Sequence, residues 1–168
     1  WSVTYESGSL PQGSYNAEVT AVSTDAAGNT ASATGTFSID TETGVAINAG
    51  HSGGDETINL AESQQSMSFA GTAEPGAIVV VTLSGVSVTT VADGSGQWTA
   101  SYAAGTLAGG EYDTTLTAVA TDAAGNTATT TSTVHVDTVA GDIALSTNPI
   151  EGDNVINAVE ASDGVWVS

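Results

Sequence analysis

The sequence predicts an all-β protein in which antiparallel β-sandwich domains follow one another along the chain. Apolar and polar residues alternate with a period of two through most of the 168 residues, and no helical period persists for three turns. Gly-rich turn segments such as DGSG and DAAGN interrupt these stretches every ~8–12 residues, which is typical of a sandwich. A third observation is an internal repeat with the length of a whole domain.

The internal repeat divides the chain into three parts. The 44 residues from Trp1 match the 44 residues from Trp98 with 22 identities, and the octapeptide TDAAGNTA is common to both. A second pair of segments, GDETINLAES at 54–63 and GDNVINAVEA at 152–161, extends the match. Repeats of this length are whole domains rather than solenoid units. We therefore expect residues 1–40 to be the C-terminal part of one repeat, residues 41–137 a complete repeat, and residues 138–168 the N-terminal part of the next.

Seven short strands are expected in the complete repeat. Trp98, Ala100 and Tyr102 share one face of the strand QWTASY, and Trp98 is expected in the core because large aromatic side chains are usually buried. Tyr112 follows the turn sequence AGGE, where a tyrosine corner would lie. These features are typical of a Greek-key, immunoglobulin-like sandwich of about seven strands. The expected strands are residues 45–48, 65–71, 77–83, 86–92, 97–102, 112–121 and 127–137.

The charge balance excludes several classes of function. The chain has 19 Asp and Glu residues, no Lys and no Arg, and a formal net charge of −19. Nucleic acid is excluded as a partner because its binding needs a basic patch, and an anionic membrane surface is disfavoured for the same reason. No apolar run is long enough to insert into a membrane. With no Cys, neither disulfides nor thiolate metal sites are available. Because no Lys or Arg balances the charge of −19, a dissolved cation is the natural counter-ion.

Acidic residues that are distant in the sequence are expected to meet at the two ends of the sandwich, because the loops of a seven-strand sandwich alternate between its ends. At the end where the chain enters the complete repeat, the expected group is Asp40, Glu42, Glu74, Asp122 and Asn126. At the end where the chain leaves it, the expected group is Asp55, Glu62, Glu111 and Asp137. The repeated positions in the flanking parts include Asp25, Asp153 and Glu160.

The ligand types in these groups indicate calcium. Clustered carboxylates resist ionisation unless a cation lies among them, and oxygen ligands without nitrogen or sulfur suit Ca²⁺ better than Mg²⁺. Zinc is disfavoured because His51 and His135 are the only nitrogen ligands of the usual kind. The alternative is that the acids only solubilise loops or form Asx turns. Turn formation does not explain the Glu residues, which are poor turn formers: Glu62, Glu74 and Glu160.

Five sequence segments, in a fixed order, resemble the bacterial immunoglobulin-like repeats of giant RTX-type adhesins and biofilm-associated proteins: GDETINLAES, GTAEPGAIVVVTLSG, DGSGQW, GEYDTTLTAVATDAAGNT and VHVDT. The resemblance implies type I secretion and attachment to the surface of a Gram-negative bacterium. It implies calcium between consecutive domains, with Asp40, Glu74 and Asp122 as junction ligands, and Asp55 and Glu62 as ligands in the first long loop. It also implies that neighbouring repeats contact one another, while other domains bind a host or abiotic surface.

These observations predict a structural function, that of an extender repeat in a large secreted adhesin or biofilm matrix protein, with calcium making the junctions rigid. We expect no enzyme, because the chain has no credible nucleophile–base pair, no G-x-S-x-G and no H-E-x-x-H. One alternative is a calcium-dependent glycan- or receptor-binding module, with Trp166 as its platform. Another is a self-assembling filament subunit, in which partial repeats of neighbouring chains complete one another. A partial repeat leaves strand edges unpaired, so we expect the chain to be a piece of a longer protein.

Overall fold

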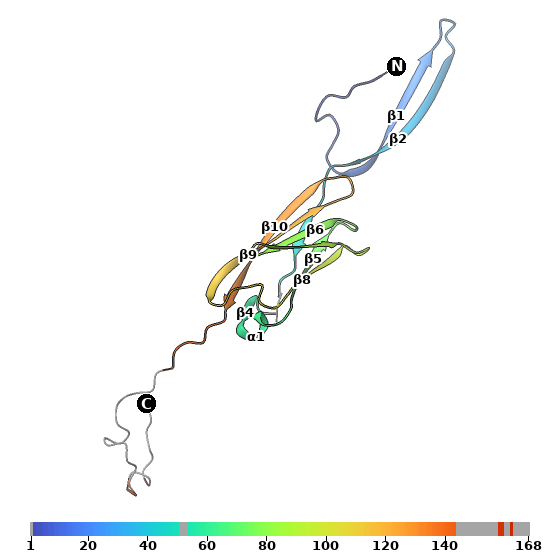
Figure 1. Cartoon of the computed structure of the whole chain (residues 1–168). Helices are drawn as coiled ribbons and strands as arrows, with labels where there is room; N and C mark the ends of the chain where they lie inside the picture. The colour runs from blue at the N-terminus through green and yellow to red at the C-terminus, as the bar shows by residue number, and fades with distance from the viewer. Residues whose placement is uncertain (1, 51–53, 144–157, 160–161, 163–168) are drawn as a thin grey trace.

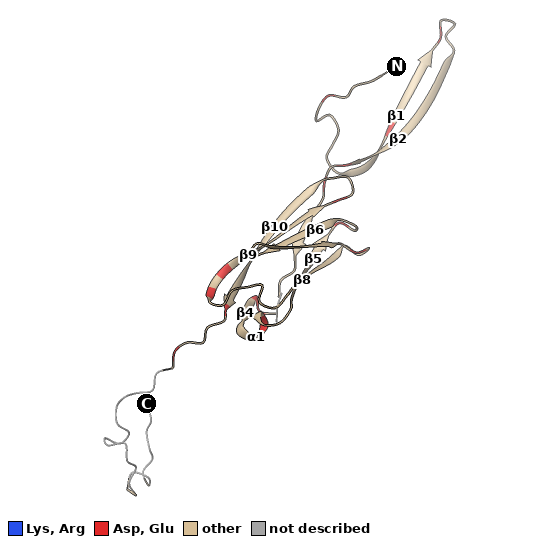
Figure 2. Ribbon diagram, in the orientation of Figure 1, with Lys and Arg blue, Asp and Glu red and all other residues tan. Residues whose placement is uncertain are grey.

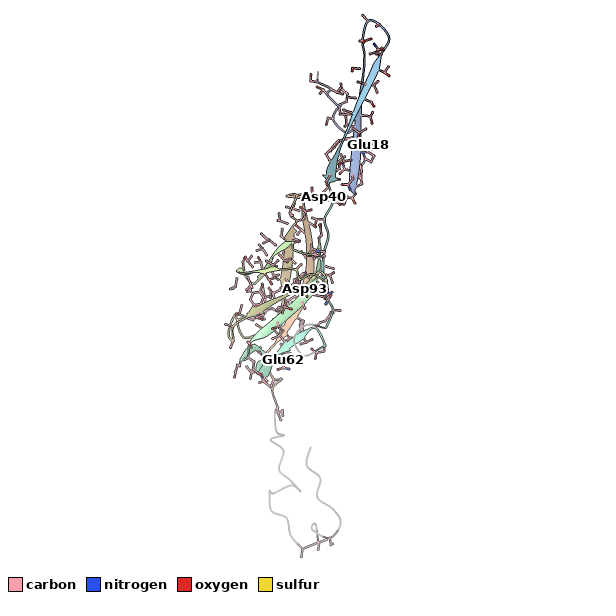
Figure 3. All side chains as sticks on the ribbon, turned by 90° about the vertical axis from the view of Figure 1, so that its right-hand side faces the viewer. Glu18, Asp40, Glu62 and Asp93 are labelled. Carbon is pink, nitrogen blue, oxygen red and sulfur yellow. The ribbon has the colours of Figure 1, made fainter. Side chains whose placement is uncertain are left out.

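The computed structural model describes residues 2–50, 54–143, 158–159 and 162. Two parts follow each other along one long axis (Figure 1). The first is an antiparallel hairpin of β1 (Ser14–Thr24) and β2 (Thr30–Asp40), and the second is a sandwich built from β3 to β10. The hairpin projects from one end of the sandwich, so Asp40, its last residue, lies at the junction between the two parts (Figure 3).

The sandwich consists of two sheets. The larger has five strands in the order β4-β10-β9-β6-β7, and the smaller has three in the order β3-β5-β8. Neighbouring strands are antiparallel, except that β4 pairs in parallel with β10 through residues 57–59 and 135–137. The strands are β3 (Val45–Ile47), β4 (Thr57–Asn59), β5 (Met67–Ala73), β6 (Ile78–Leu83), β7 (Val86–Val91), β8 (Gln97–Tyr102), β9 (Glu111–Thr121) and β10 (Thr127–Asp137).

The core lies between the two sheets and contains the alternate side chains that the sequence indicates. Trp98 and Tyr102 from β8 and Phe69 from β5 are almost fully buried, which confirms the expected position of Trp98. The rings of Phe69 and Tyr102 pack edge to face, with centroids 5.7 Å apart. The Tyr102 hydroxyl donates to the carbonyl oxygen of Val81 in the opposite sheet at 2.7 Å, so the buried phenol has a partner.

The β1–β2 hairpin has the same local structure as β9 and β10. Its register pairs Ser14 with Asp40, and the corresponding register of the sandwich pairs Glu111 with Asp137, at positions 97 residues later. Each hairpin also has a tyrosine corner: Tyr15 donates its hydroxyl hydrogen bond to the carbonyl of Pro11 at 3.0 Å, and Tyr112 donates to that of Ala108 at 2.8 Å. The tyrosine corner expected at Tyr112 is therefore confirmed.

The all-β sandwich is confirmed, with two additions in the first long loop. The strands expected at 97–102 and 127–137 coincide with β8 and β10, and the others agree within a few residues. The structure adds β4 and a four-residue helix, α1 (Leu60–Ser63), so the sandwich has eight strands among the described residues instead of seven. Both additions are too short to show a period in the sequence. No helix in the described part of the chain is long and apolar enough to cross a membrane.

Candidate metal centre at the domain junction

Three carboxylates meet where the hairpin joins the sandwich. Asp40 ends β2, Glu74 follows β5 directly, and Asp122 follows β9 directly. One carboxylate oxygen of each lies within 4.8 Å of the other two. The described residues contain no other group of three acidic, His or Cys side chains with this spacing. We call Asp40, Glu74 and Asp122 the junction carboxylates; the chain has no Lys or Arg that could neutralise them (Figure 2).

Asp122 is buried and held by the turn that joins β9 to β10. Its Oδ1 accepts hydrogen bonds from the backbone N–H of Gly125 at 2.7 Å and of Asn126 at 2.8 Å. Its Oδ2 accepts from Nδ2 of Asn126 at 2.8 Å. Burial raises the pKa of Asp122, but these hydrogen bonds from Asn126 and Gly125 outweigh it and lower the pKa below its usual value. Asp122 is therefore ionised at neutral pH.

Asp40 has an acceptor that no protein group satisfies. Its Oδ1 is buried and has no hydrogen-bond partner among the described residues, and the same is true of the Thr43 hydroxyl in the linker that follows. A buried carboxylate oxygen without a donor is costly, and a bound cation would remove that cost. Glu74 is exposed at the same junction, so its carboxylate can turn toward an ion without breaking a structural contact.

Asn126, which was also expected at this junction, contributes through its amide nitrogen. Nδ2 donates to Asp122 and also to the backbone carbonyl of Asp40, 86 positions away, at 3.2 Å. Any contact of Asn126 with a metal would have to come from Oδ1, because an amide nitrogen is no ligand for a hard cation. The sequence indicated Asn126 as a possible oxygen ligand but not this positioning role.

Glu42, which was expected at the same end, and Asp25, the repeat counterpart of Asp122 in the flanking part, both lie outside the junction carboxylates. Glu42 is exposed in the linker and lies outside the group of junction carboxylates. Asp25 lies in the turn at the far tip of the β1–β2 hairpin, where its carboxylate accepts from the Ala27 and Asn29 backbone N–H groups and the Asn29 side chain. The hydrogen bond from the Asn29 side chain is the largest cause of the lowered pKa of Asp25.

The acids expected at the opposite end form no comparable group within the described residues. Asp55 accepts from the backbone N–H of Thr57 at 3.1 Å, and Asp137 accepts from that of Val139 at 3.1 Å. Glu111 pairs across the strands with Asp137 in the β9–β10 register. Their metal role stays a prediction. Four residues of the sequence predictions lie outside the described residues: His51, Asp153, Glu160 and Trp166.

Glu62 has a local structural role that the sequence interpretation overlooked. Its Oε2 accepts from the backbone N–H of Asn59 at 3.0 Å, and Asn59 Oδ1 accepts from the N–H of Glu62 at 3.1 Å. These reciprocal bonds are a capping box at the start of α1. Turn formation was the only local role that the sequence interpretation weighed for Glu62, and it missed this cap. The spacing N-x-x-E was the available signal.

One ion pair lies on the outer face of β9 and β10. Nδ1 of His135 is 2.7 Å from Oδ1 of Asp113, its cross-strand partner. The hydrogen bond to Asp113 is the largest cause that raises the pKa of His135, and the charges of Asp113, Asp137 and Glu111 raise it further. The sequence interpretation considered His135 as a nitrogen ligand for zinc, which it disfavoured, and did not predict the pair.

Comparisons with known proteins find that the chain is similar to solved parts of bacterial adhesins. A solved region of a 1.5-MDa bacterial ice-binding adhesin, studied for its host cell surface retention, is 29% identical over 90% of this chain, with a TM-score of 0.54. A Ca²⁺-stabilized adhesin that helps an Antarctic bacterium reach out and bind ice is 34% identical over 90% of this chain, with a TM-score of 0.48. A bacterial immunoglobulin-like domain from the M. primoryensis ice-binding adhesin is 30% identical over 55% of this chain and 94% of its own, with a TM-score of 0.42.

This chain spans 51% and 39% of the first two of those solved chains. No curated protein sequence matches it. Residues 43–138 match the family of the bacterial Ig-like domain, and this range contains the sandwich from β3 to β10. Because this match covers more than half of the chain, the protein belongs to the bacterial Ig-like domain family.

Proposed function

We propose that this chain is an extender segment of a large secreted bacterial adhesin, in which calcium makes the junctions between consecutive Ig-like repeats rigid. In this proposal residues 1–40 end one repeat, residues 41–137 form a complete repeat and residues 138–168 begin the next. The likeness to a bacterial ice-binding adhesin supports the extender role. So does the end-to-end arrangement of hairpin and sandwich, which adds length with every repeat (Figure 1).

The observation that carries the calcium proposal is the group of junction carboxylates. Their oxygens come from both sides of one junction and lie within 4.8 Å of one another, and Asp40 Oδ1 is buried without a donor. Such a set of hard oxygen donors, completed by backbone carbonyls and water, fits Ca²⁺, which takes 6–8 oxygen ligands in flexible geometry. A chain without Lys or Arg has no permanently cationic side chain that could replace the ion at this site.

The mechanism follows from the repulsion between like charges. Without a cation, the three carboxylates repel one another across the junction, and this repulsion weakens the contact between the hairpin and the sandwich. A bound Ca²⁺ reverses the sign of that interaction and holds Asp40 of one part to Glu74 and Asp122 of the other. Extracellular modules of this kind bind calcium with Kd values of about 10⁻⁴–10⁻³ M. Millimolar calcium outside the cell would then keep a chain of repeats extended.

The proposed setting is the surface of a Gram-negative bacterium or its biofilm matrix, reached by secretion. The immediate partners are the neighbouring repeats of the same protein, and a non-catalytic, mechanical role is sufficient for such a segment. Binding to a host or abiotic surface would be the task of other domains.

Calorimetric titration with calcium tests the proposal. Glu74→Gln removes one charge without removing any described structural contact, so it should weaken calcium binding at least tenfold. Glu18→Gln makes the same chemical change on the exposed face of β1, away from the junction, and is the matched control (Figure 3). The proposal fails if the unaltered chain binds no calcium, or if Glu74→Gln and Glu18→Gln bind it equally well.

A further inference from the structure

The linker between hairpin and sandwich is hydrogen-bonded from both sides by protein groups. Thr41 Oγ1 accepts from the backbone N–H of Gly13 at 2.8 Å and donates to the carbonyl of Gly13 at 3.4 Å. These bonds tie the linker to the loop before β1. One residue earlier, the carbonyl of Asp40 accepts from Nδ2 of Asn126 at 3.2 Å, which ties the linker to the β9–β10 turn of the sandwich.

The Asn126 side chain is oriented before it reaches the linker. Its backbone N–H donates to Asp122 Oδ1 at 2.8 Å, and the backbone N–H of Asp122 donates to the carbonyl of Asn126 at 3.1 Å. One hydrogen of Nδ2 is used by Asp122 Oδ2, which leaves the second hydrogen for the carbonyl of Asp40. A rigid turn therefore presents one donor to the last residue of the preceding repeat, and little conformational entropy is lost when the bond forms.

The hairpin contains the same turn, and no linker contacts it within the described part of the chain. Asn29 donates its backbone N–H to Asp25 Oδ1 at 2.8 Å and its Nδ2 to Asp25 Oδ2 at 2.8 Å, as Asn126 does with Asp122. Among the described residues, no linker carbonyl accepts from Asn29. The chain thus offers two copies of one turn that differ in whether they contact a linker, and this makes Asn29 a matched control for Asn126.

We propose that Asn126 is a metal-independent docking residue, which orients the sandwich on the terminal Asp40 of the preceding repeat before any cation binds. The proposal rests on the role of this junction as a joint between repeats, but not on calcium. With the Asp40 backbone held in place, the junction carboxylates stay close together despite their repulsion. An aspartate at position 126 would lack the two donor hydrogens and would add a fourth negative charge to the same site. A cation therefore meets a site that is already formed.

Distance measurement by pulsed EPR tests this role. Since the chain has no Cys, spin labels can be attached through Ser32→Cys on exposed β2 and Thr89→Cys on exposed β7. In EDTA, the otherwise unaltered chain and Asn29→Ala should give one narrow distance distribution, and Asn126→Ala should give a broad one. Asn126→Asp keeps the backbone N–H that bonds Asp122 and should also broaden the distribution. Thermal unfolding monitored by circular dichroism verifies that each variant is folded.

The outcomes separate this proposal from the calcium proposal. A distribution in EDTA that is unchanged by Asn126→Ala, or one that is already broad in the unaltered chain, would overturn the docking role even if calcium binds. A narrow distribution in EDTA that Asn126→Ala broadens would support docking even if no calcium binds. Where calcium does bind, Asn126→Ala should raise its Kd roughly 2- to 12-fold, the factor that corresponds to losing one net hydrogen bond.

Discussion

Gly71 on β5 and Trp98 on β8 are cross-strand partners, and the indole ring of Trp98 fills the space in which a side chain at position 71 would lie. A Cβ atom on Gly71 would overlap this ring and the backbone carbonyl of Ala46 on β3. The backbone cannot move away easily, because β5 is hydrogen-bonded on both sides in the small sheet. The largest core side chain thus depends on the absence of a side chain on its neighbour.

Gly71→Ala should therefore destabilise the sandwich. Overpacking of a core costs about 1–3 kcal/mol, which for a domain of this size corresponds to a fall in Tm of roughly 5–20 °C. Gly35→Ala on β2 is the control, since a Cβ atom there meets nothing within 4 Å. Circular dichroism melting measures both. Equal Tm values for the two variants would contradict the steric explanation.

Tyr102 should make the sandwich sensitive to alkali. Burial raises the pKa of its hydroxyl from the usual 10.0 to about 12. The unfolded chain releases this proton near pH 10, whereas the folded chain keeps it. The contribution of Tyr102 to the free energy of unfolding is therefore fully present below pH 10 and is lost between pH 10 and 12. Tyr102→Phe should flatten that fall in a denaturant series over this range. It should also lower stability at pH 7 by about 1–3 kcal/mol, because the carbonyl of Val81 loses its donor.

The sequence was sufficient for the parts of this structure that depend on a period or on topology. Alternation places the strands because the two faces of a strand meet different surroundings, and the alternation of loops between the two ends brings Asp40, Glu74 and Asp122 together. It was insufficient where a single local contact decides. Glu62 belongs to a capping box, which the spacing N-x-x-E indicates only if a helix begins there. The amide of Asn126 directs its nitrogen to Asp40, which depends on backbone geometry that residue types do not specify.

The pair His135–Asp113 should be visible in a pH titration. Asp113 and the neighbouring acids raise the folded-state pKa of His135, so the stabilisation is complete below about pH 6.5 and is lost as the pH rises through the folded-state value. Asp113→Asn should lower the pKa of His135, as NMR of the imidazole resonances would show. Asp93→Asn, an acid in the turn before β8, should leave it unchanged. An unshifted His135 in Asp113→Asn would mean that the pair does not form in solution.

Substitution of Glu62 can show whether this acid is structural or a metal ligand, because a capping box and a calcium site respond differently to the same substitution. Gln at this position of the helix can still accept from the N–H of Asn59, so Glu62→Gln should keep the Tm, whereas Asn59→Ala should cost about 0.5–2 kcal/mol. If Glu62 only caps α1, Glu62→Gln should also leave the calorimetric calcium affinity unchanged. A tenfold loss of calcium affinity in Glu62→Gln at an unchanged Tm would instead make Glu62 a ligand. The first long loop would then contain a second calcium site besides the junction.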